Sequence, residues 1–161
     1  MSQPFIIAPE DRPHLDLAHS QVKVLATSVQ TGGDFTLMQT HTEPGGGPPL
    51  HLHRDAAEAF FVLQGEFLMY IDDHQALCPA GTFVYVPRAT PHTFKVVSDT
   101  PGKKLNLFSP AAMTEYFEEM AAAHKTGSVT PELLREIAAR CHMEVLGPVP
   151  DRSLLEVGSL A

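Results

Sequence analysis

Basic residues are scarce in this sequence. It has 11 Lys and Arg against 19 Asp and Glu, which gives a formal net charge of −8, and Lys103-Lys104 is its only adjacent basic pair. Surfaces that bind phosphate backbones or anionic lipid need clustered Lys and Arg. The composition therefore predicts neither a nucleic-acid partner nor a membrane partner.

Long apolar runs are absent, and there are only two cysteines. No apolar stretch approaches the roughly 20 residues that span a bilayer, and the first nine residues lack the basic start and apolar run of a secretory signal. These absences favour a cytoplasmic location. Cys78 and Cys141 lie far apart in segments of different kinds, so we expect no disulfide between them.

The sequence shows no internal repeat, and its size fits one domain. With 161 residues, 43% of them hydrophobic, it can bury a core without disulfides. Short runs rich in Val, Phe, Thr, Leu and Tyr alternate with turn residues such as Gly32-Gly33 and Gln64-Gly65, which is typical of an antiparallel all-β sandwich or barrel. The strands expected are residues 23–30, 35–42, 50–53, 58–63, 66–71, 75–78, 82–86, 92–97 and 104–108.

After residue 108 the apolar period changes from 2 to about 3.6. Ser109-Pro110 and Thr130-Pro131 each read as a helix N-cap followed by proline at the first helical position. We therefore expect an N-terminal segment (1–20), a β-barrel (21–109), a helical extension that packs on the barrel (110–146) and a tail (147–161).

The segment from residue 45 to 65 contains a metal-ligand pattern. Successive side chains of a strand point to opposite faces, so His51 and His53 project to the same side and can share one ion. Glu58 opens the next strand, with Phe60 and Val62 on the same face. A buried, unpaired carboxylate is costly, and a metal ion would remove that cost.

A fourth ligand candidate follows in the segment from residue 81 to 94. His92 begins a strand just after Pro91. Three imidazoles and one carboxylate suit one divalent transition metal, namely Fe, Mn, Ni, Co, Cu or Zn. Calcium and magnesium prefer shells of oxygen ligands, so they are poor candidates.

Both segments resemble the paired motifs of the cupin superfamily. The first motif is Gly, five residues, His, any residue, His, four residues, Glu, six residues, Gly, and all its positions match, at Gly45, His51, His53, Glu58 and Gly65. The second motif is matched at Gly81, Pro87 and His92, whereas Ala89 replaces its glycine and Val96 its asparagine. The resemblance covers residues 35–109. It implies a double-stranded β-helix, the cupin jelly-roll barrel, with a short C-terminal helical extension.

The ligand pattern and the barrel together predict a pocket for a small molecule. We expect its lining to include Phe60, Val62 and Phe94, with Gln39 and His41 nearer the mouth. Four protein ligands leave positions open on an ion that accepts six, as catalysis requires. Alternatively, each of these apolar side chains simply fills the core of the barrel, as in other small barrels.

Three functions fit these features. The chain resembles single-domain cupins similar to bacterial quercetinases (quercetin dioxygenases), which implies a metal-dependent dioxygenase of a small aromatic or enolisable substrate, with Glu58 as ligand and general base. A small-molecule binding or sensing protein without turnover is the second, although no helix-turn-helix precedes the barrel. A metal-dependent isomerase or lyase of a small polar substrate is the third, but the polar candidates are few, namely Gln39 and Arg88. Cupins serve all three, so the fold alone does not choose.

An open barrel edge, and an acidic chain with apolar N-terminal and C-terminal segments, invite the exchange of strands or helices between subunits. We therefore expect a homodimer.

Overall fold

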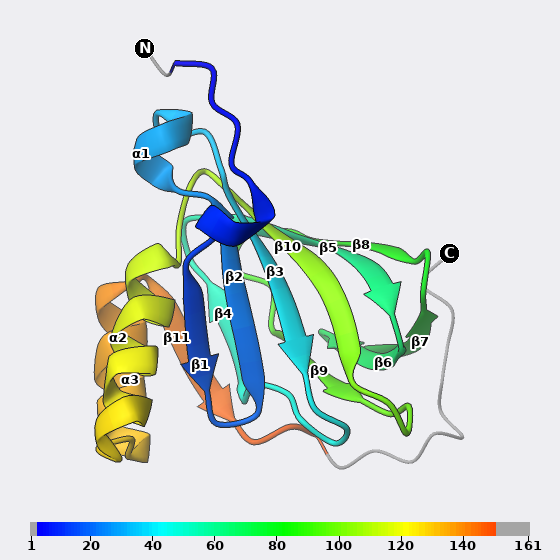
Figure 1. Cartoon of the computed structure of the whole chain (residues 1–161). Helices are drawn as coiled ribbons and strands as arrows, with labels where there is room; N and C mark the ends of the chain where they lie inside the picture. Colours follow the sequence, from blue (N-terminus) through cyan, green and yellow to red (C-terminus); the bar gives the residue numbers. More distant parts are fainter. Residues whose placement is uncertain (1–2, 151–161) are drawn as a thin grey trace.

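The computed structural model describes residues 3–150, and these form two antiparallel sheets that face each other (Figure 1). The six-stranded sheet has the order β1 (His14–Leu17), β2 (Ser20–Ala26), β3 (Thr36–Thr42), β10 (Gly102–Ser109), β5 (Ala57–Gln64) and β8 (Phe83–Val86). The five-stranded sheet has the order β11 (Met143–Gly147), β4 (Leu50–His53), β9 (His92–Val96), β6 (Glu66–Ile71) and β7 (His74–Pro79). This arrangement confirms the predicted all-β jelly roll.

The space between the sheets holds two hydrophobic clusters. One joins Phe108 and Met38 of the six-stranded sheet to Tyr116 and Ile137 of the helices. The other contains Phe60, Val62, Phe67, Phe94 and neighbouring buried side chains. His53 packs edge-on against Phe108 of the first cluster, and His92 lies beside Phe60 of the second. The predicted ligands therefore lie where the two clusters meet.

Two helices cover the side of the barrel where β1 and β11 form the sheet edges (Figure 1). Helix α2 (Thr114–Thr126) packs on β1 and α3 (Pro131–Arg140) packs on β11, which confirms a helical extension on the barrel. Helix α3 begins as predicted, because the Thr130 hydroxyl accepts a hydrogen bond from the backbone N–H of Leu133.

The predicted start of the first helix is wrong. Strand β10 continues to Ser109, which pairs with Ala57 of β5, so Ser109 ends a strand and caps no helix. Helix α2 begins at Thr114 instead, after Met113 turns the chain with a φ of 72°.

Three other short elements differ from the expectation. Residues 28–31 form helix α1 (Ser28–Thr31) and do not extend the strand, because Thr27 and Gln30 make a reciprocal capping box. Strands β1 and β11 were not predicted, and a 3-10 turn, η1 (Pro9–Asp11), precedes β1. Both strands add to sheet edges, in segments that we had assigned to the N-terminal segment and the helical extension.

Cys78 and Cys141 are both free thiols, as expected. Among residues 3–150 there is no helix long and apolar enough to cross a membrane. Residues 151–161 of the predicted tail (147–161) lie outside the described residues.

Candidate metal centre

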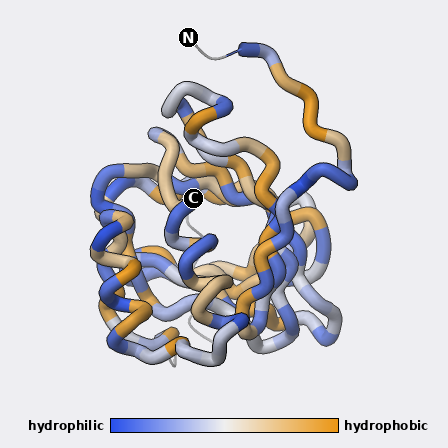
Figure 2. The backbone as a smooth tube through the Cα atoms, turned by 60° about the vertical axis from the view of Figure 1, so that its left-hand side comes forward, coloured by the Kyte–Doolittle hydropathy of each residue, from blue (hydrophilic) through white to orange (hydrophobic). Residues whose placement is uncertain are grey.

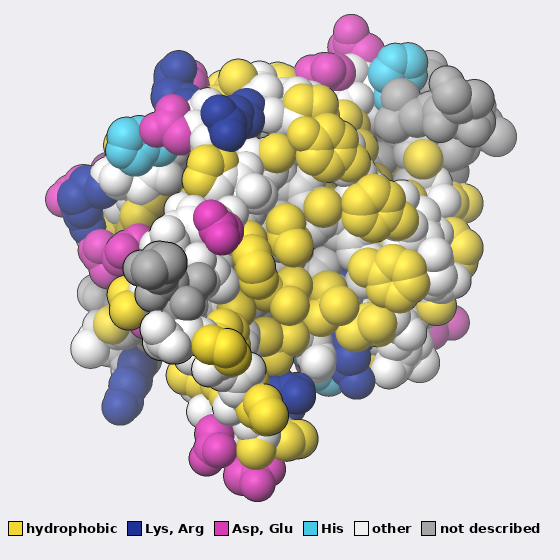
Figure 3. Space-filling model, turned by 90° about the horizontal axis from the view of Figure 1, so that it is seen from above, with side chains coloured by type: hydrophobic (Ala, Val, Ile, Leu, Met, Phe, Trp, Pro, Cys, Tyr) yellow, Lys and Arg dark blue, Asp and Glu magenta, His cyan; other side chains and the backbone are white. Residues whose placement is uncertain are grey.

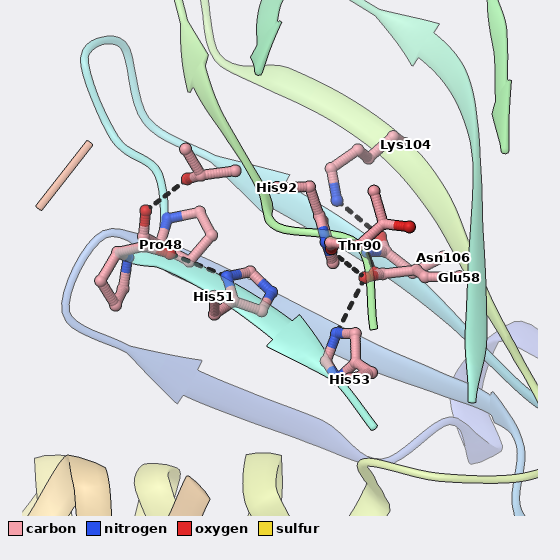
Figure 4. A network of polar contacts seen from close by, with 10 residues as sticks. Pro48, His51, His53, Glu58, Thr90, His92, Lys104 and Asn106 are labelled. Atoms are coloured by element: carbon pink, nitrogen blue, oxygen red, sulfur yellow. Dashed lines mark hydrogen bonds and ion pairs between the residues drawn. The ribbon is translucent and has the colours of Figure 1, made fainter. Parts of the chain in front are cut away.

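His51, His53, Glu58 and His92 converge between the two sheets, and one ligand atom from each lies within 4.8 Å of the others (Figure 4). His51 and His53 come from β4, and His51 pairs directly with His92 of the neighbouring strand β9. Glu58 reaches across from β5 of the opposite sheet. All four side chains are buried. The four predicted ligands are therefore brought together as the parity of their strands requires.

The glycine-rich loop before β4 holds the first two histidines in place. A Cβ atom on Gly47 would come within 1.9 Å of the Phe94 carbonyl oxygen, so only glycine allows the loop to lie this close to β9. The next residue is tied to the same strand, because the Thr93 hydroxyl donates to the Pro48 carbonyl at 2.6 Å. The loop therefore delivers His51 beside His92.

Backbone carbonyls orient two of the three imidazole rings. Nδ1 of His51 donates to the Pro49 carbonyl at 2.7 Å, and Nδ1 of His92 donates to the Thr90 carbonyl at 2.8 Å. Because a carbonyl only accepts, Nδ1 carries the proton in both rings, and Nε2 of the neutral ring carries a lone pair. Metal-binding histidines are commonly fixed in this way.

The donor atoms are spaced as ligands of a common cation would be. Nε2 of His92 and Nε2 of His53 lie 3.0 Å and 3.1 Å from the same Glu58 oxygen, Oε2. A lone pair and a carboxylate oxygen repel at this distance unless a proton or a cation lies between them. Two donors bound to one ion at about 2.1 Å, at a right angle, would lie about 3.0 Å apart. The residues thus fit a transition-metal ion, with Nε2 of the histidines and Oε2 of Glu58 as donors.

The electrostatics of the site keep the ligands in their metal-binding forms. Burial, reinforced by the nearby His92 and His53, lowers the pKa of His51 from 6.5 to about 3, so this ring is neutral at pH 7. Burial acts to raise the pKa of Glu58, but without the metal a proton takes the place of the ion, and hydrogen bonds donated by ring N–H groups of His53 and His92 outweigh burial and hold that pKa well below 4.5. Neutral imidazole and ionised carboxylate are the forms that bind metal.

A pH dependence of the metal-free protein follows from the pKa of His51. This pKa is depressed in the folded state, so the unfolded chain binds the proton more readily between about pH 6.5 and about pH 3. The free energy of unfolding should be highest above this window and fall as the pH falls through it, with Glu58 adding to the loss below 4.5. Urea denaturation of metal-free protein across this window measures the effect.

The matched comparison uses two variants. His51→Gln should show a shallower pH dependence, whereas replacement of the exposed His74 by Gln should leave it unchanged. Equal pH dependence in the wild type and His51→Gln would contradict the assignment.

Three polar residues extend the site beyond the predicted ligands. Asn106 of β10 donates from Nδ2 to the other Glu58 oxygen, Oε1, at 2.9 Å. Lys104, two residues earlier on the same face, donates from Nζ to Asn106 Oδ1 at 2.8 Å. The Thr40 hydroxyl also donates to Oδ1, at 3.1 Å. Sequence reasoning missed all three, although Lys104 and Asn106 alternate with Leu105 and Leu107 and so share one face of their strand.

The site opens on a cavity of about 240 Å³. Phe60 and Phe94 line it, as predicted, together with Lys104 and Asn106, and Tyr116 and Met120 of α2 line it on the helical side. Its wall is therefore mainly apolar, with a few polar groups near Glu58.

The other expected pocket residues lie elsewhere. Val62 has the predicted inward direction but is fully buried in the second hydrophobic cluster and does not line the cavity. Gln39 and His41 alternate with the buried Met38, Thr40 and Thr42 of β3, so their half-buried side chains point to the outer face of the sheet. The expectation for Gln39 and His41 as pocket residues is therefore wrong.

The two departures from the second motif are accommodated differently. Ala89 adopts a φ of 57°, a left-handed conformation that favours glycine, and its N–H donates to the His53 carbonyl at 2.7 Å. Val96 is buried in the second hydrophobic cluster. Neither change removes a ligand.

A jelly-roll barrel with three histidines and one glutamate converging inside it defines a class of small metal-binding barrels. Residues 38–108 match the family described as Cupin domain, and they include three of the strands that carry the site, β4, β5 and β9. Residues 38–108 of this barrel are a cupin domain.

Among curated proteins, the sequence is 31% identical over 75 residues to quercetin 2,3-dioxygenase of Bacillus subtilis. That match spans 47% of this chain but only 22% of the dioxygenase. A protein of Methanocaldococcus jannaschii with no described function is 26% identical over 83 residues, or 52% of this chain and 66% of that one. The chain thus spans less than two thirds of each of these relatives.

Solved structures show the same fold at low sequence identity. KdgF from a Halomonas species superposes with a TM-score of 0.61 over 67% of this chain and 94% of its own, at 18% identity. An RmlC-like cupin from Shewanella frigidimarina gives a TM-score of 0.59 over 68% and 93%, at 22% identity. At this level of identity the likeness concerns the fold alone.

Proposed function

We propose that this cupin is a metal-dependent dioxygenase that acts on a small aromatic or enolisable substrate. The observation that carries the proposal is the placement of a buried three-histidine, one-glutamate site at the wall of a mainly apolar cavity of about 240 Å³. A cavity of this kind suits an aromatic ligand with few polar groups. The similarity of the central segment to a quercetin dioxygenase supports the same class of substrate.

In this proposal His51, His53, Glu58 and His92 hold one divalent transition metal, which is Fe, Mn, Ni, Co, Cu or Zn. When bound, such an ion supplies Lewis-acid and redox chemistry and leaves positions open for small ligands. Phe60 and Phe94 exclude water and contact the flat faces of the substrate. Glu58 is the only carboxylate among the described residues that line the cavity, so it is the candidate base for a substrate hydroxyl proton.

Asn106 has a positioning role in this scheme. Its amide holds Glu58 Oε1 while Oε2 faces the histidines, so the carboxylate has one fixed orientation toward the ligands. The side chains of Lys104, Asn106 and Glu58 form a connected network of buried polar groups. Hydrogen-bond networks of this kind rigidify a site.

The experiment that tests the proposal measures metal and oxygen on the same protein. Protein purified without added metal is analysed for transition metals, reconstituted with each candidate ion in turn, and assayed for dioxygen uptake with quercetin and simpler enolisable phenols. Uptake that depends on one of the ions supports the dioxygenase. Tight binding of a phenol with no uptake by any metal form would instead indicate a binding or sensing protein without turnover.

A second candidate function is favoured by a specific observation. An isomerase or lyase of a polar substrate needs several polar groups that point into the cavity. The two candidates from the sequence do not supply them, because Gln39 points outward and Arg88 is exposed. The structure supplies Lys104, Asn106 and Thr40 in their place. Conversion of a small hydroxy or keto acid without dioxygen, by the metal-loaded protein under nitrogen, would support this alternative.

We also propose that the protein is a homodimer formed through the outer face of the six-stranded sheet. Exposed or half-buried apolar side chains gather there on neighbouring strands. In Figure 3 the face seen from above carries a broad hydrophobic area over the strands that lie uppermost in Figure 1. The area includes Phe61, Leu63, Phe83, Tyr85, Leu105 and Leu107, with Leu105 directly opposite Phe61 in the strand register.

Two further features support the proposal that a second copy of the chain covers this face. Strand β8 is an edge of the sheet, and its Phe83 and Tyr85 are 65% and 59% exposed. The segment before η1 extends away from the body with a hydrophobic stretch, in which Ile6 is fully exposed (Figure 2). An apolar arm and an apolar face on one chain can pair reciprocally in a two-fold dimer.

Replacing Phe83 and Tyr85 together by Ser should convert the dimer to a monomer, because it removes the two most exposed aromatic side chains of the face. Sedimentation velocity at about 50 μM reports the change. The matched control is Leu77→Ser on β7 of the other sheet, where a 43% exposed leucine is lost, and it should stay dimeric. A wild type that sediments as a monomer would refute the proposal.

The cytoplasmic location and the absence of nucleic-acid and membrane partners remain predictions from the sequence.

A further inference from the structure

Lys104 is the most unusual charged residue of the barrel. It lies on β10 opposite Thr40 of β3 and Val62 of β5, and its side chain has no exposed surface. Lysine is almost never fully buried unless it is paired, because transfer of an ammonium group out of water is costly. The position of Lys104 therefore requires an explanation.

The protein itself satisfies this ammonium group only in part. Nζ donates one hydrogen bond, to Asn106 Oδ1, and lies over the rings of Phe60 and Phe94 at 4.5 Å and 4.3 Å from their centroids. An ammonium group has three donors. Among residues 3–150 no carboxylate forms an ion pair with Lys104.

Burial penalises this charge. It lowers the pKa of Lys104 from 10.5 to about 7, although the negative charge of Glu58 acts in the opposite direction. Aromatic faces stabilise a cation less than a carboxylate does. A methionine of similar length would pack in the same space without this cost, so the amino group is unfavourable for folding in the metal-free, ligand-free chain.

The surroundings of Nζ indicate what completes its shell. Lys104 lines the same cavity as the four metal ligands, and Figure 4 shows its side chain in the same polar network as Asn106 and Glu58. The aromatic rings of Phe60 and Phe94 and the amide of Asn106 flank its nitrogen, and these three residues line the cavity as well. An anionic oxygen of a ligand would provide the missing partner, in a medium of low dielectric where such a hydrogen bond is strong.

We propose that Lys104 is a second anchor of the ligand site, which binds an anionic oxygen at one end of a small aromatic ligand while the metal centre binds a hydroxyl at the other end. The inference rests on the proposed function only for the metal-bound end of the ligand. It goes further in specifying the substrate as an acid, whereas an apolar cavity alone would accept a neutral phenol.

The hydrogen-bond chain limits the size of such a ligand. Nζ is linked to Glu58 Oε1 by two hydrogen bonds, of 2.8 Å and 2.9 Å, through the single amide group of Asn106. The two ends of this chain are therefore at most about 8 Å apart. One aromatic ring with a carboxylate opposite its hydroxyl groups spans a distance of this order.

The test compares two probes that differ in one group. Catechol and 3,4-dihydroxybenzoate carry the same adjacent hydroxyls, but only the second carries a carboxylate on the far side of the ring. Binding is measured by calorimetry on the full chain loaded with Zn²⁺, without dioxygen, so that no turnover is needed. The wild type should bind 3,4-dihydroxybenzoate about 10- to 100-fold more tightly than catechol, as one buried charge-assisted hydrogen bond allows.

The Lys104→Met variant should lose this preference and bind the two probes within about threefold of each other. Its catechol affinity and its zinc content should match the wild type, and its melting temperature should be equal or higher because the buried charge is gone. The matched control is Lys95→Met, which removes an exposed lysine of β9 and should keep the full preference. Lys104→Gln repeats the test with a polar side chain, in case the methionine variant packs differently.

Each outcome is decisive. Loss of the preference in Lys104→Met and Lys104→Gln, with catechol binding retained, supports the anchor. An equal loss of affinity for both probes would show that Lys104 only positions Glu58 through Asn106 and would overturn the proposal, as would a wild type without preference or a variant that keeps it. Absence of dioxygen uptake in the separate assay would bear on the dioxygenase alone, because the calorimetry requires no reaction.

Discussion

Replacing Glu58 by glutamine is expected to lower turnover by about two to four orders of magnitude while the fully metallated protein still binds substrate. This loss is typical of removing a general base. The amide is nearly isosteric with the carboxylate, and Asn106 can still contact it, so the change tests proton acceptance more than shape. The measurement is dioxygen uptake with quercetin, or with the best phenol of the screen, at matched metal content.

The control for this variant is Glu43→Gln, which neutralises an exposed carboxylate that does not line the cavity. It should leave the rate unchanged. A metal-loaded Glu58→Gln protein with undiminished uptake would eliminate the base role and leave Glu58 as a ligand only.

The variant that combines His51→Ala and His53→Ala is expected to lose transition metal almost completely. These rings supply two of the four donors, and both come from β4, so no nearby residue of that strand can replace them. Loss of two donors should weaken binding by at least about 100-fold, more than a change in the groups that only orient the ligands. Metal analysis after dialysis against a weak chelator measures the difference.

A matched variant removes two histidines that point elsewhere. His41→Ala with His74→Ala changes one half-buried and one exposed ring of the outer surface, and it should retain the metal content of the wild type. Full occupancy in the His51→Ala, His53→Ala protein would show that the metal lies at another site.

The sequence was sufficient for the ligands because their geometry is local. His51 and His53 lie on one face of any strand that contains them, and the glycine and proline residues before them indicate a tight approach. His92 needs only the pairing of β4 with β9 to reach the same place. Strand parity therefore predicted the shared face of His51 and His53, whereas parity alone did not place His92.

The same rule did not settle β3 and β10, because parity allows two faces and does not say which one is inside. In β3 we expected Gln39 and His41 to face inward, and for β10 we predicted no face. In β10 the apolar Leu105 and Leu107 alternate with Lys104 and Asn106, and a simple amphipathic pattern places the leucines inside. The register reverses this choice: Phe108 pairs with Glu58, so Lys104 and Asn106 share the inner face with the ligands. The leucines face outward, on the surface that we assign to the second subunit.

The edge strands and the first helix depended on contacts distant in the chain. Strand β11 follows the two helices and pairs with β4, which lies much earlier in the chain. Nothing in the five residues of β11 themselves requires a strand. Residues 109–110 resemble a helix start by composition, but pairing of β10 with β5 keeps Ser109 in a strand. Local patterns therefore located the site more reliably than the limits of the barrel.

The most direct test of the metal centre is an anomalous difference map from crystals of the protein loaded with Co²⁺. We expect one strong peak per chain between the two sheets, about 2.0 to 2.2 Å from Nε2 of His51, His53 and His92 and from Oε2 of Glu58. A peak at a different cluster, or none at full cobalt loading, would contradict the assignment of these four residues.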